Sequence, residues 1–310
     1  MTFESGMNCE IKAYAKVNLH LEVLNRRKDG YHNIMSLMSK IRLYDLLKLD
    51  PVNLKKGDED LKVTFSDVSG PFSEVIRGLP LNENLIVRAL RNYCRKAGVC
   101  GEVKIGIEKN IPSGAGLAGG SSDAAAALNL VNKIMEYPLS SEDLNTLGAE
   151  IGADVPFCLQ ESPFAFCEGI GDAVEALDIS SGDFMLLLHN GIHVDTSYAY
   201  RSLGRVESVD VNGSEIESRK KSIKQTLGKS GLRQASTLFY NDFEKPVFDR
   251  FPEIASLKNE VIKEGAYFAI MTGSGSTVIA LFEDQKKLKK AETTFKNRLQ
   301  TVFVTGFLKD

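Results

Sequence analysis

Apolar and polar residues alternate in some stretches of this chain and recur at helical spacing in others. Val17, Leu19, Leu21 and Val23 alternate with polar neighbours within Ile11–Leu24, which predicts a half-buried strand. Further strands are predicted at 103–107, as a pair within 41–65 around the polar turn KKGDED, at 184–188 and at 278–282. Strands and helices therefore mix along the whole chain.

Two segments have the apolar spacing and end signals of helices. The first follows Asn84, a typical N-cap, and closes at Gly98. The second begins at Ser140 or Ser141 and ends at Gly152. The interval 204–231 is rich in Ser, Lys, Glu and Gly and predicts a surface insertion that is partly mobile.

The bulk composition is that of an ordinary globular protein. The 310 residues are 43% hydrophobic and 25% charged, with a net charge of −3, so no nucleic-acid partner is indicated. The length suits two domains. We place their boundary near 169–172, which gives domains 1–170 and 171–310. No internal repeat is visible.

The cysteines and the apolar runs narrow the location of the protein. The five cysteines are odd in number and form no C-x-x-C, which favours reduced thiols and no structural metal. No apolar run approaches ~18 residues, and the first ten residues lack the regions of a signal peptide. We therefore expect a cytoplasmic protein without a membrane partner.

The stretch Ile111–Leu128, IPSGAGLAGGSSDAAAAL, reads as a glycine loop that joins the strand at 103–107 to a helix. Glycines let the backbone approach a ligand closely. At the helix start, the N–H groups of Ser121, Ser122 and Asp123 are expected to point at an anion, and the helix dipole adds to the attraction. The pattern predicts a phosphate site.

Other interpretations of the loop remain open on local pattern alone. Gly114, Gly116 and Gly119 satisfy the G-x-G-x-x-G of dinucleotide sites, although Pro112 and Ser113 separate them from the strand. A Walker A loop is excluded, because no Lys-Ser or Lys-Thr pair follows the glycines. The loop could also be a flexible turn capped by a serine.

The sequence P-x-x-x-G-L-x-G-G-S-S-x-A-A, at 112–125, resembles the ATP-phosphate loop of the GHMP kinase superfamily. The resemblance implies ATP as a ligand, with Mg²⁺ bridging its β- and γ-phosphates. It also implies a set of ATP-binding residues: Pro112, Gly114, Gly116, Leu117, Gly119, Gly120, Ser121 and Ser122.

Two further motifs and a catalytic position of the superfamily are matched. A-K-x-N-L-x-L contains Lys16 and Asn18, and the resemblance places the lysine near the phosphoryl acceptor and the asparagine in the substrate pocket. GADVPF places Asp154 at the position of the catalytic aspartate. MTGSGST, with Gly273 and Gly275, resembles the third motif, a glycine turn that packs beside the phosphate loop. From the local pattern alone, the lysine could be a solvated strand residue and the aspartate a turn residue that bonds its own backbone.

The segment DGYH at 29–32 is, by resemblance, typical of one branch of the superfamily, in which Tyr31 and His32 hold a cytosine ring. Stacking and edge hydrogen bonding would suit a pyrimidine, which offers both a π face and a polar edge. Tyr200 is the candidate for a second aromatic, although it could equally be a packing residue. The segment NDFE at 241–244 resembles another family signature, to which we assign no chemistry.

The resemblance implies an α/β (α+β) two-domain fold, with an N-terminal domain like domain 2 of ribosomal protein S5, a ferredoxin-like C-terminal domain and substrates between them. For this branch it implies transfer of the ATP γ-phosphoryl to the 2-hydroxyl of a methylerythritol moiety in isoprenoid biosynthesis, with Asp154 as proton acceptor and Lys16 stabilising charge. The alternatives are another small-molecule kinase, of mevalonate or homoserine type, and a non-catalytic nucleotide sensor. We expect a monomer or weak homodimer that acts on a small molecule.

Overall fold

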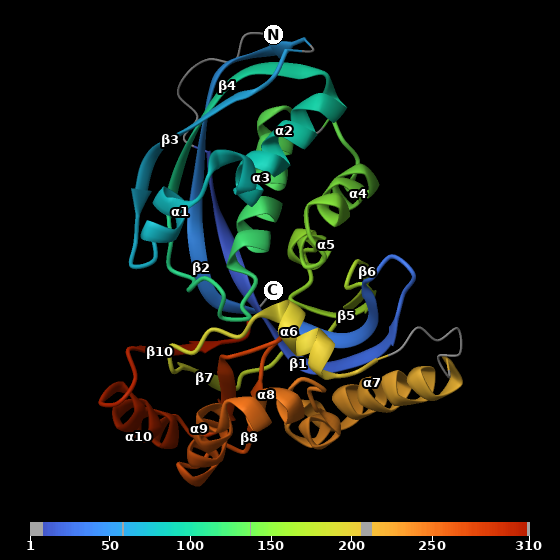
Figure 1. Cartoon of the computed structure of the whole chain (residues 1–310), viewed down its shortest axis with the longest axis vertical. Coiled ribbons are helices and arrows are strands. Elements are labelled where there is room, and N and C mark those ends of the chain that lie inside the picture. The colour runs from blue at the N-terminus through green and yellow to red at the C-terminus, as the bar shows by residue number, and fades with distance from the viewer. Residues whose placement is uncertain (1–8, 58, 137, 206–212, 309–310) are drawn as a thin grey trace. The chain divides into compact units, whose positions relative to one another are not determined.

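The computed structural model describes residues 9–57, 59–136, 138–205 and 213–308. The chain forms two compact units, and each unit is built from segments that are separate in the sequence (Figure 1). The first contains the segment that ends at Lys16, Leu43–Ser113 and Ala118–Glu161. The second contains Val17–Arg42, Gly114–Leu117 and the chain from Ser162. Because the units interleave, the linear division into 1–170 and 171–310 stays a prediction.

The first unit combines β strands with a layer of helices. Strand β4 (Val99–Glu108) pairs antiparallel with the end of β2 (His32–Lys56) and parallel with β3 (Lys62–Ser69), and β1 (Cys9–Arg26) pairs with β2. Helices α2, α3, α4 and α5 lie together beside this sheet (Figure 1). Their bounds are Leu85–Ala97, Gly119–Ile134, Ser141–Ile151 and Val155–Leu159; α1 (Glu74–Gly78) and a 3₁₀ turn (Leu81–Glu83) precede them.

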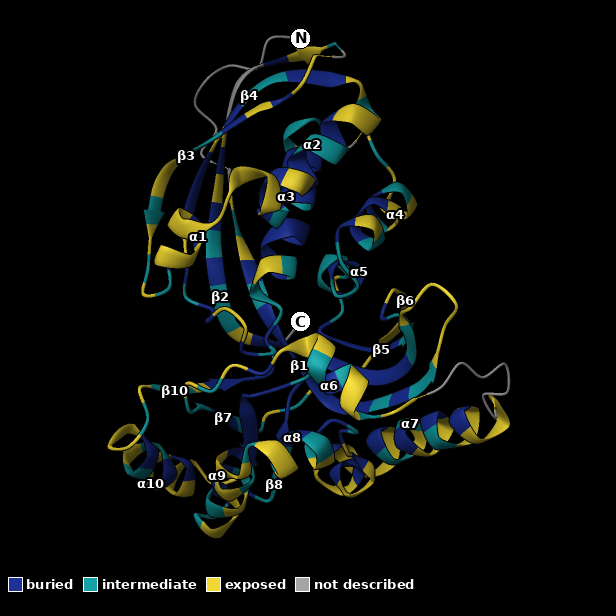
Figure 2. Ribbon diagram, viewed as in Figure 1, coloured by how far each residue is buried: buried dark blue, intermediate teal, exposed yellow. Residues whose placement is uncertain are grey.

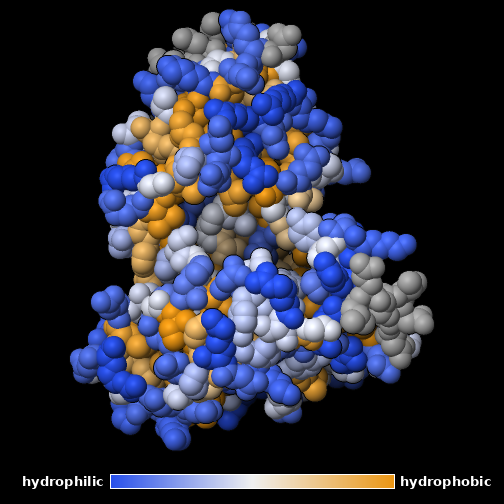
Figure 3. Space-filling model, viewed as in Figure 1, coloured by the Kyte–Doolittle hydropathy of each residue, from blue (hydrophilic) through white to orange (hydrophobic). Residues whose placement is uncertain are grey.

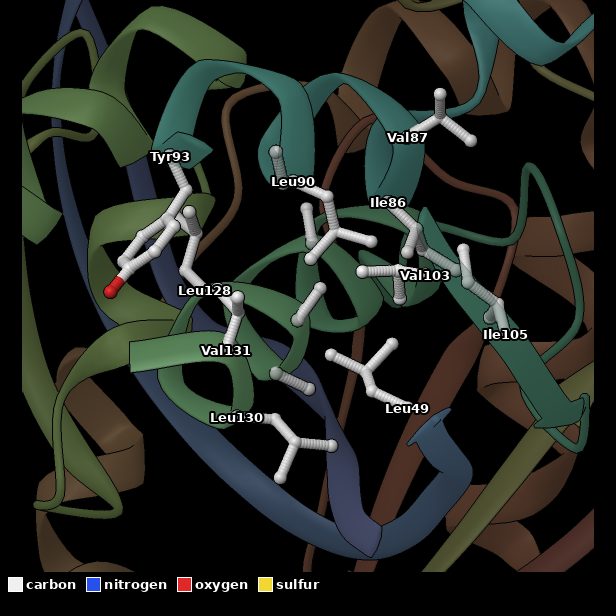
Figure 4. Packing of buried hydrophobic residues seen from close by; sticks show 14 of the residues in the cluster. Leu49, Ile86, Val87, Leu90, Tyr93, Val103, Ile105, Leu128, Leu130 and Val131 are labelled. Carbon is white, nitrogen blue, oxygen red and sulfur yellow. The ribbon is translucent and has the colours of Figure 1, made fainter. Parts of the chain in front are cut away.

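The core of the first unit lies between α2, α3 and the sheet (Figure 4). Leu90 of α2, Val131 of α3 and Val103 of β4 are each at most 1% exposed. The Tyr93 hydroxyl donates to the Asn132 side chain over 2.9 Å, so the single polar end of that buried ring is paired. This packing holds the start of α3 at the end of β4, where the glycine loop lies.

Both predicted helices of this unit are confirmed, together with their end signals. The Asn84 side chain accepts the Ile86 N–H, and Gly98 adopts the left-handed conformation with φ 64°. At α4, Ser140 and Asp143 form a capping box. The predicted strands are present too, although β2 begins earlier than expected, at His32.

The second unit contains a four-stranded antiparallel sheet in the order β10–β7–β9–β8. These strands span Thr301–Gly306, Phe184–His189, Val278–Phe282 and Phe268–Met271. Helices α9 (Pro252–Lys263) and α10 (Gln285–Lys296) pack on this sheet. The start of β2 pairs with β5 (Phe164–Gly169), which pairs with β6 (Ala173–Leu177). The unit also contains two short helices, α6 (Thr196–Ser202) and α8 (Glu244–Arg250).

The interval 204–231, predicted as a partly mobile surface insertion, is helical from residue 213 onward, while 206–212 lie outside the described residues. Helix α7 spans Gly213–Ala235, with a break at Gly231. Ile216, Ile223 and Leu227 are buried at helical spacing, and Figure 2 shows buried and exposed parts along α7. The Lys220 ammonium lies 2.9 Å from a Glu175 oxygen. The helix is stabilised by packing rather than by its polar composition.

Hydrophilic side chains predominate over much of the face shown in Figure 3, with smaller hydrophobic areas among them. Within the part of the chain that the structure describes, none of the helices combines the length and apolarity that crossing a bilayer requires.

Candidate active site

The glycine loop enters α3 through a residue with unusual backbone geometry. Ala118 is the N-cap, with φ 53° and no side-chain cap bond. The Ser122 N–H donates to the Ala118 carbonyl over 2.9 Å, so the N–H groups that point beyond the helix end are those of Gly119, Gly120 and Ser121. The prediction that Ser122 and Asp123 offer free N–H groups there is therefore wrong. The N–H groups of Gly119 and Gly120 occupy that place instead, beside that of Ser121.

The side chain of Ser122 has a partner within the protein. Its hydroxyl donates to the Tyr14 carbonyl over 2.6 Å, and the residue is 3% exposed. This bond ties the first turn of α3 to β1, two residues before Lys16. A direct contact between Ser122 and a phosphate stays a prediction.

Lys16 and Asp154 lie together in the first unit. The Lys16 ammonium is 3.4 Å from an Asp154 carboxylate oxygen, with the side chains 6% and 30% exposed. Asp154 is the N-cap of α5 but makes no side-chain cap bond. The alternative interpretations, a solvated strand lysine and a self-bonded turn aspartate, are therefore both wrong. A Cβ built at Gly152 would lie 3.7 Å from the Ser121 hydroxyl, which places the GADVPF turn against the first turn of α3.

Three of the loop glycines face protein atoms where a Cβ would be. A Cβ at Gly114 would lie 2.8 Å from the His193 ring, and one at Gly116 would lie 2.6 Å from the Thr272 carbonyl oxygen. At Gly119 the Lys109 ammonium is 3.0 Å away. Pro112 and Leu117 of the same loop are buried.

The third motif packs against the loop, as predicted. Thr272 meets Gly116, and its hydroxyl accepts the Asn18 N–H over 2.7 Å. The Asn18 amide donates to the Ser36 hydroxyl over 2.8 Å. Gly273 has φ +59° and Gly275 φ +100°, conformations that favour glycine. All these contacts lie within the second unit, so it brings Asn18 together with the loop segment 114–117 and the turn 272–275.

An aromatic group stands elsewhere in the second unit. The His32 and Tyr200 rings stack with centroids 4.9 Å apart, and Tyr200 meets Phe243 edge-on. Tyr31 is 61% exposed. Burial, followed by the charges of Arg26 and Arg205, lowers the pKa of His32, so its ring is neutral at pH 7 and can both donate and accept hydrogen bonds. The three residues predicted to hold cytosine thus comprise one exposed ring and one stacked pair.

Sequence reasoning missed a buried ionic cluster under the loop. The Lys109 ammonium contacts Asp45 and lies 2.7 Å from an Asp123 oxygen, and all three side chains are at most 4% exposed. Asp45 also accepts the Ile111 N–H over 2.8 Å. The cluster joins the end of β4, β2 and α3. No local pattern signals it, because its members lie 14 and 64 residues apart.

The NDFE segment, to which we assigned no chemistry, supports the third motif. Asn241 donates to the Met271 and Gly273 carbonyls, over 2.7 and 2.8 Å. Glu244 accepts the Met271 N–H over 2.9 Å. The resemblance is a usable signal for the segment but not for this role.

Models of one protein family match both halves of the chain. The model for the GHMP kinases N terminal domain matches residues 84–162, and the model for the GHMP kinases C terminal domain matches residues 222–300. A 4-diphosphocytidyl-2-C-methyl-D-erythritol kinase of Clostridium kluyveri is 35% identical over 296 residues, which is 95% of this chain and 98% of the relative.

Solved structures agree. A crystal structure of 4-(cytidine 5'-diphospho)-2C-methyl-D-erythritol kinase superposes with a TM-score of 0.75 at 30% identity, covering 97% of this chain and 100% of the other. Homoserine kinase from Cytophaga hutchinsonii gives a TM-score of 0.70 at 16% identity, covering 98% and 97%; this likeness shows the fold alone. The predicted two-domain α/β fold class is confirmed.

Proposed function

Because the chain belongs to the GHMP kinase family, we propose that it transfers the γ-phosphoryl group of ATP to the 2-hydroxyl of 4-diphosphocytidyl-2-C-methyl-D-erythritol, a step of isoprenoid precursor biosynthesis. The observation that carries the proposal is the Lys16–Asp154 pair, 3.4 Å apart, in the same compact unit as the first turn of α3. A charged pair beside a helix N-terminus is the arrangement that phosphoryl transfer needs, because it combines a phosphate site with groups that act on the nucleophile.

The roles follow from the chemistry of each group. The N–H groups of Gly119, Gly120 and Ser121 bind the ATP phosphates at the positive end of the α3 dipole. Asp154 accepts the proton of the attacking hydroxyl and orients that hydroxyl. Lys16 stabilises the charge that moves between the reacting oxygens. Asn18 lies two positions after Lys16 in β1, so both side chains leave the strand on the same face.

Mg²⁺ fits this set of residues as a companion of the nucleotide. Among the described residues, no group of three or more His, Cys, Asp or Glu side chains is arranged to hold a metal ion. Mg²⁺ commonly takes one or two protein oxygens and the substrate phosphates, and the Ser121 hydroxyl and the Asp154 carboxylate are oxygen donors on adjoining turns. When bound, the ion would neutralise the charge on the β- and γ-phosphates.

The cytosine of the acceptor would be recognised in the second unit by Tyr31, His32 and Tyr200. The His32–Tyr200 stack supplies a flat apolar face with a neutral ring nitrogen at its edge. The exposed Tyr31 ring supplies a second face that is accessible to a ligand. Aromatic stacking is tolerant of base identity, so the edge contact from His32 would provide the selectivity for cytosine.

A coupled ADP-release assay tests the function directly. With ATP and Mg²⁺, we expect turnover with 4-diphosphocytidyl-2-C-methyl-D-erythritol and none with mevalonate or L-homoserine. Turnover with either of the other two acceptors would instead support a different kinase of the family. ATP binding by calorimetry without turnover on any acceptor would support a nucleotide sensor. We further propose a cytoplasmic monomer or weak homodimer without a nucleic-acid partner.

A further inference from the structure

Asn241 is a buried residue whose side-chain amide makes three hydrogen bonds, two of them to carbonyls at the glycine turn of the third motif, residues 272–275. Its amide nitrogen donates to the Met271 carbonyl over 2.7 Å and to the Gly273 carbonyl over 2.8 Å. Its amide oxygen accepts the Phe243 N–H over 2.9 Å. Asn241 is 4% exposed. Because carbonyls stand at one end of the amide and a donor at the other, its orientation is fixed.

The turn that Asn241 holds contacts two parts of the proposed ATP and acceptor machinery. A Cβ on Gly116 would lie 2.6 Å from the Thr272 carbonyl oxygen, so the loop and the turn are in backbone contact there. The Thr272 hydroxyl accepts the Asn18 N–H, and a Cβ on Gly273 would lie 3.6 Å from the Asn18 amide oxygen. Any shift of the turn must therefore move Gly116, Asn18 or both, because these segments are in close contact and no space separates them.

We infer that Asn241 is a positioning residue for phosphoryl transfer: by bridging the carbonyls on either side of Thr272, it fixes the turn against which the phosphate loop and Asn18 are placed. This inference rests on the proposed function. The chemistry is specific to an amide, because only a group with two N–H donors and one acceptor satisfies both carbonyls and the Phe243 N–H.

The sharpest variant is Asn241→Asp, which keeps the shape and the acceptor but removes both donors. Its carboxylate would face two carbonyl oxygens at distances that are set for hydrogen bonds, so the turn must move or the acid must take up a proton. Once protonated, the carboxyl group that this substitution introduces can donate to one carbonyl only. We therefore expect N241D to recover part of its activity as pH falls, relative to the parent.

The matched control is Asn132→Asp. Asn132 is 3% exposed, donates to the Leu139 carbonyl over 3.0 Å and accepts the Leu139 N–H. It lies 13 residues beyond Gly119 in α3, about 20 Å along the helix axis. N132D thus makes the same chemical change at a comparable buried amide, away from the loop and the turn.

The experiment compares the parent, N241D and N132D below their thermal transitions, with folding checked by circular dichroism. In N241D, losing two buried hydrogen bonds should weaken ATP binding about tenfold by calorimetry and lower kcat, with the deficit narrowing at lower pH. N132D should lose thermal stability while its ATP affinity and kcat stay parental. If N241D does not fold, N241S takes its place. Its hydroxyl can donate a hydrogen bond but is too short to reach both carbonyls, so ATP affinity and kcat should again fall.

Parental ATP affinity and kcat in a folded N241D or N241S protein would overturn the inference and leave Asn241 a purely structural residue. An equal loss of ATP affinity in N132D would overturn it as well, since the effect would then be general. Failure of the proposed function is distinguishable, because the parent itself would then bind no ATP or turn over no diphosphocytidyl acceptor.

Discussion

The buried cluster of Lys109, Asp45 and Asp123 makes a measurable prediction about stability and pH. Burial, opposed by Lys109 and reinforced by the charge of Asp45, raises the pKa of Asp123 from 3.8 to about 7. Between those values the folded protein holds a proton that the unfolded chain has released. The free energy of unfolding contributed by this group is therefore highest at low pH and falls as pH rises from about 4 to about 7. Asp123→Asn removes the titration while keeping the shape.

The magnitude follows from the pKa of Asp123. A tenfold change in proton affinity is worth about 1.4 kcal/mol, so a span of about three pH units corresponds to at most about 4 kcal/mol. Burial alone would lower the pKa of Lys109, but Asp123 and Asp45 outweigh it and raise that pKa above 10.5. Lys109 therefore stays charged throughout the window and adds no slope of its own.

Another buried group works in the opposite direction, so the comparison must be a difference between proteins. Burial, assisted by the charge of Arg219, lowers the pKa of His20 from 6.5 to about 4. Between pH 4 and 6.5 the unfolded chain binds a proton that the folded protein excludes, and stability from His20 rises with pH. The parent curve alone mixes both effects, whereas D123N and the parent share the His20 contribution.

The assay is urea unfolding followed by circular dichroism, at intervals from about pH 4.5 to about 8, for the parent, D123N and the control D60N. The stability of D123N relative to the parent should increase across this range by up to about 3 kcal/mol, with most of the change below about pH 7. Asp60, whose side chain is 86% exposed, should give a curve parallel to that of the parent. A D123N curve that is also parallel would refute the reasoning, because Asp123 would then not titrate in this window.

Three further predictions concern the proposed reaction. Asp154→Asn and Lys16→Met should lower kcat and kcat/KM together, the former by ~10²–10⁴-fold, with both substrate affinities within a few-fold of the parent; near-parental kcat in D154N would move the base elsewhere. Tyr31→Ala should weaken binding of CDP by ~1–3 kcal/mol and leave ATP affinity unchanged, and equal CDP binding in calorimetry would contradict the cytosine assignment. Gly116→Ala should lower both the thermal midpoint and ATP affinity, because its Cβ would lie 2.6 Å from a backbone oxygen. Gly120→Ala, whose Cβ would have only a leucine methyl at 3.5 Å, should stay folded. Similar thermal midpoints for the two variants would show that the turn can shift to accept a side chain at Gly116.

Features set by neighbouring residues could be predicted from the sequence. Asn84 and Gly98 mark the ends of α2 because a cap bond and a left-handed residue are local requirements. Lys16 and Asp154 are recognisable only through motifs of the family, since nothing local distinguishes a paired strand lysine from a solvated one. Their separation of 3.4 Å depends on how β1 and the start of α5 pack, and this is not written in either motif.

Helix α7 shows how composition can hide periodicity. The stretch from Gly213 is so rich in Ser, Lys and Glu that it resembles a solvated insertion, yet Ile216, Ile223 and Leu227 recur on one face and are buried. A narrow apolar stripe suffices when charged residues are also paired, as Lys220 is with Glu175. Composition alone therefore misses a helix that the spacing of its apolar residues indicates.

For the glycine loop, the sequence predicts a phosphate site at the start of α3 but explains only part of the need for glycine. Glycine density ahead of α3 indicates close approach of the backbone to a phosphate, and the N–H groups of Gly119 and Gly120 at the helix end support that interpretation. At Gly116, however, the missing side chain makes room for Thr272, which lies 156 positions later in the chain. A glycine in a motif can be required by a ligand, by a neighbouring backbone, or by both. Sequence pattern cannot separate these, because the neighbouring backbone comes from a distant segment of the chain.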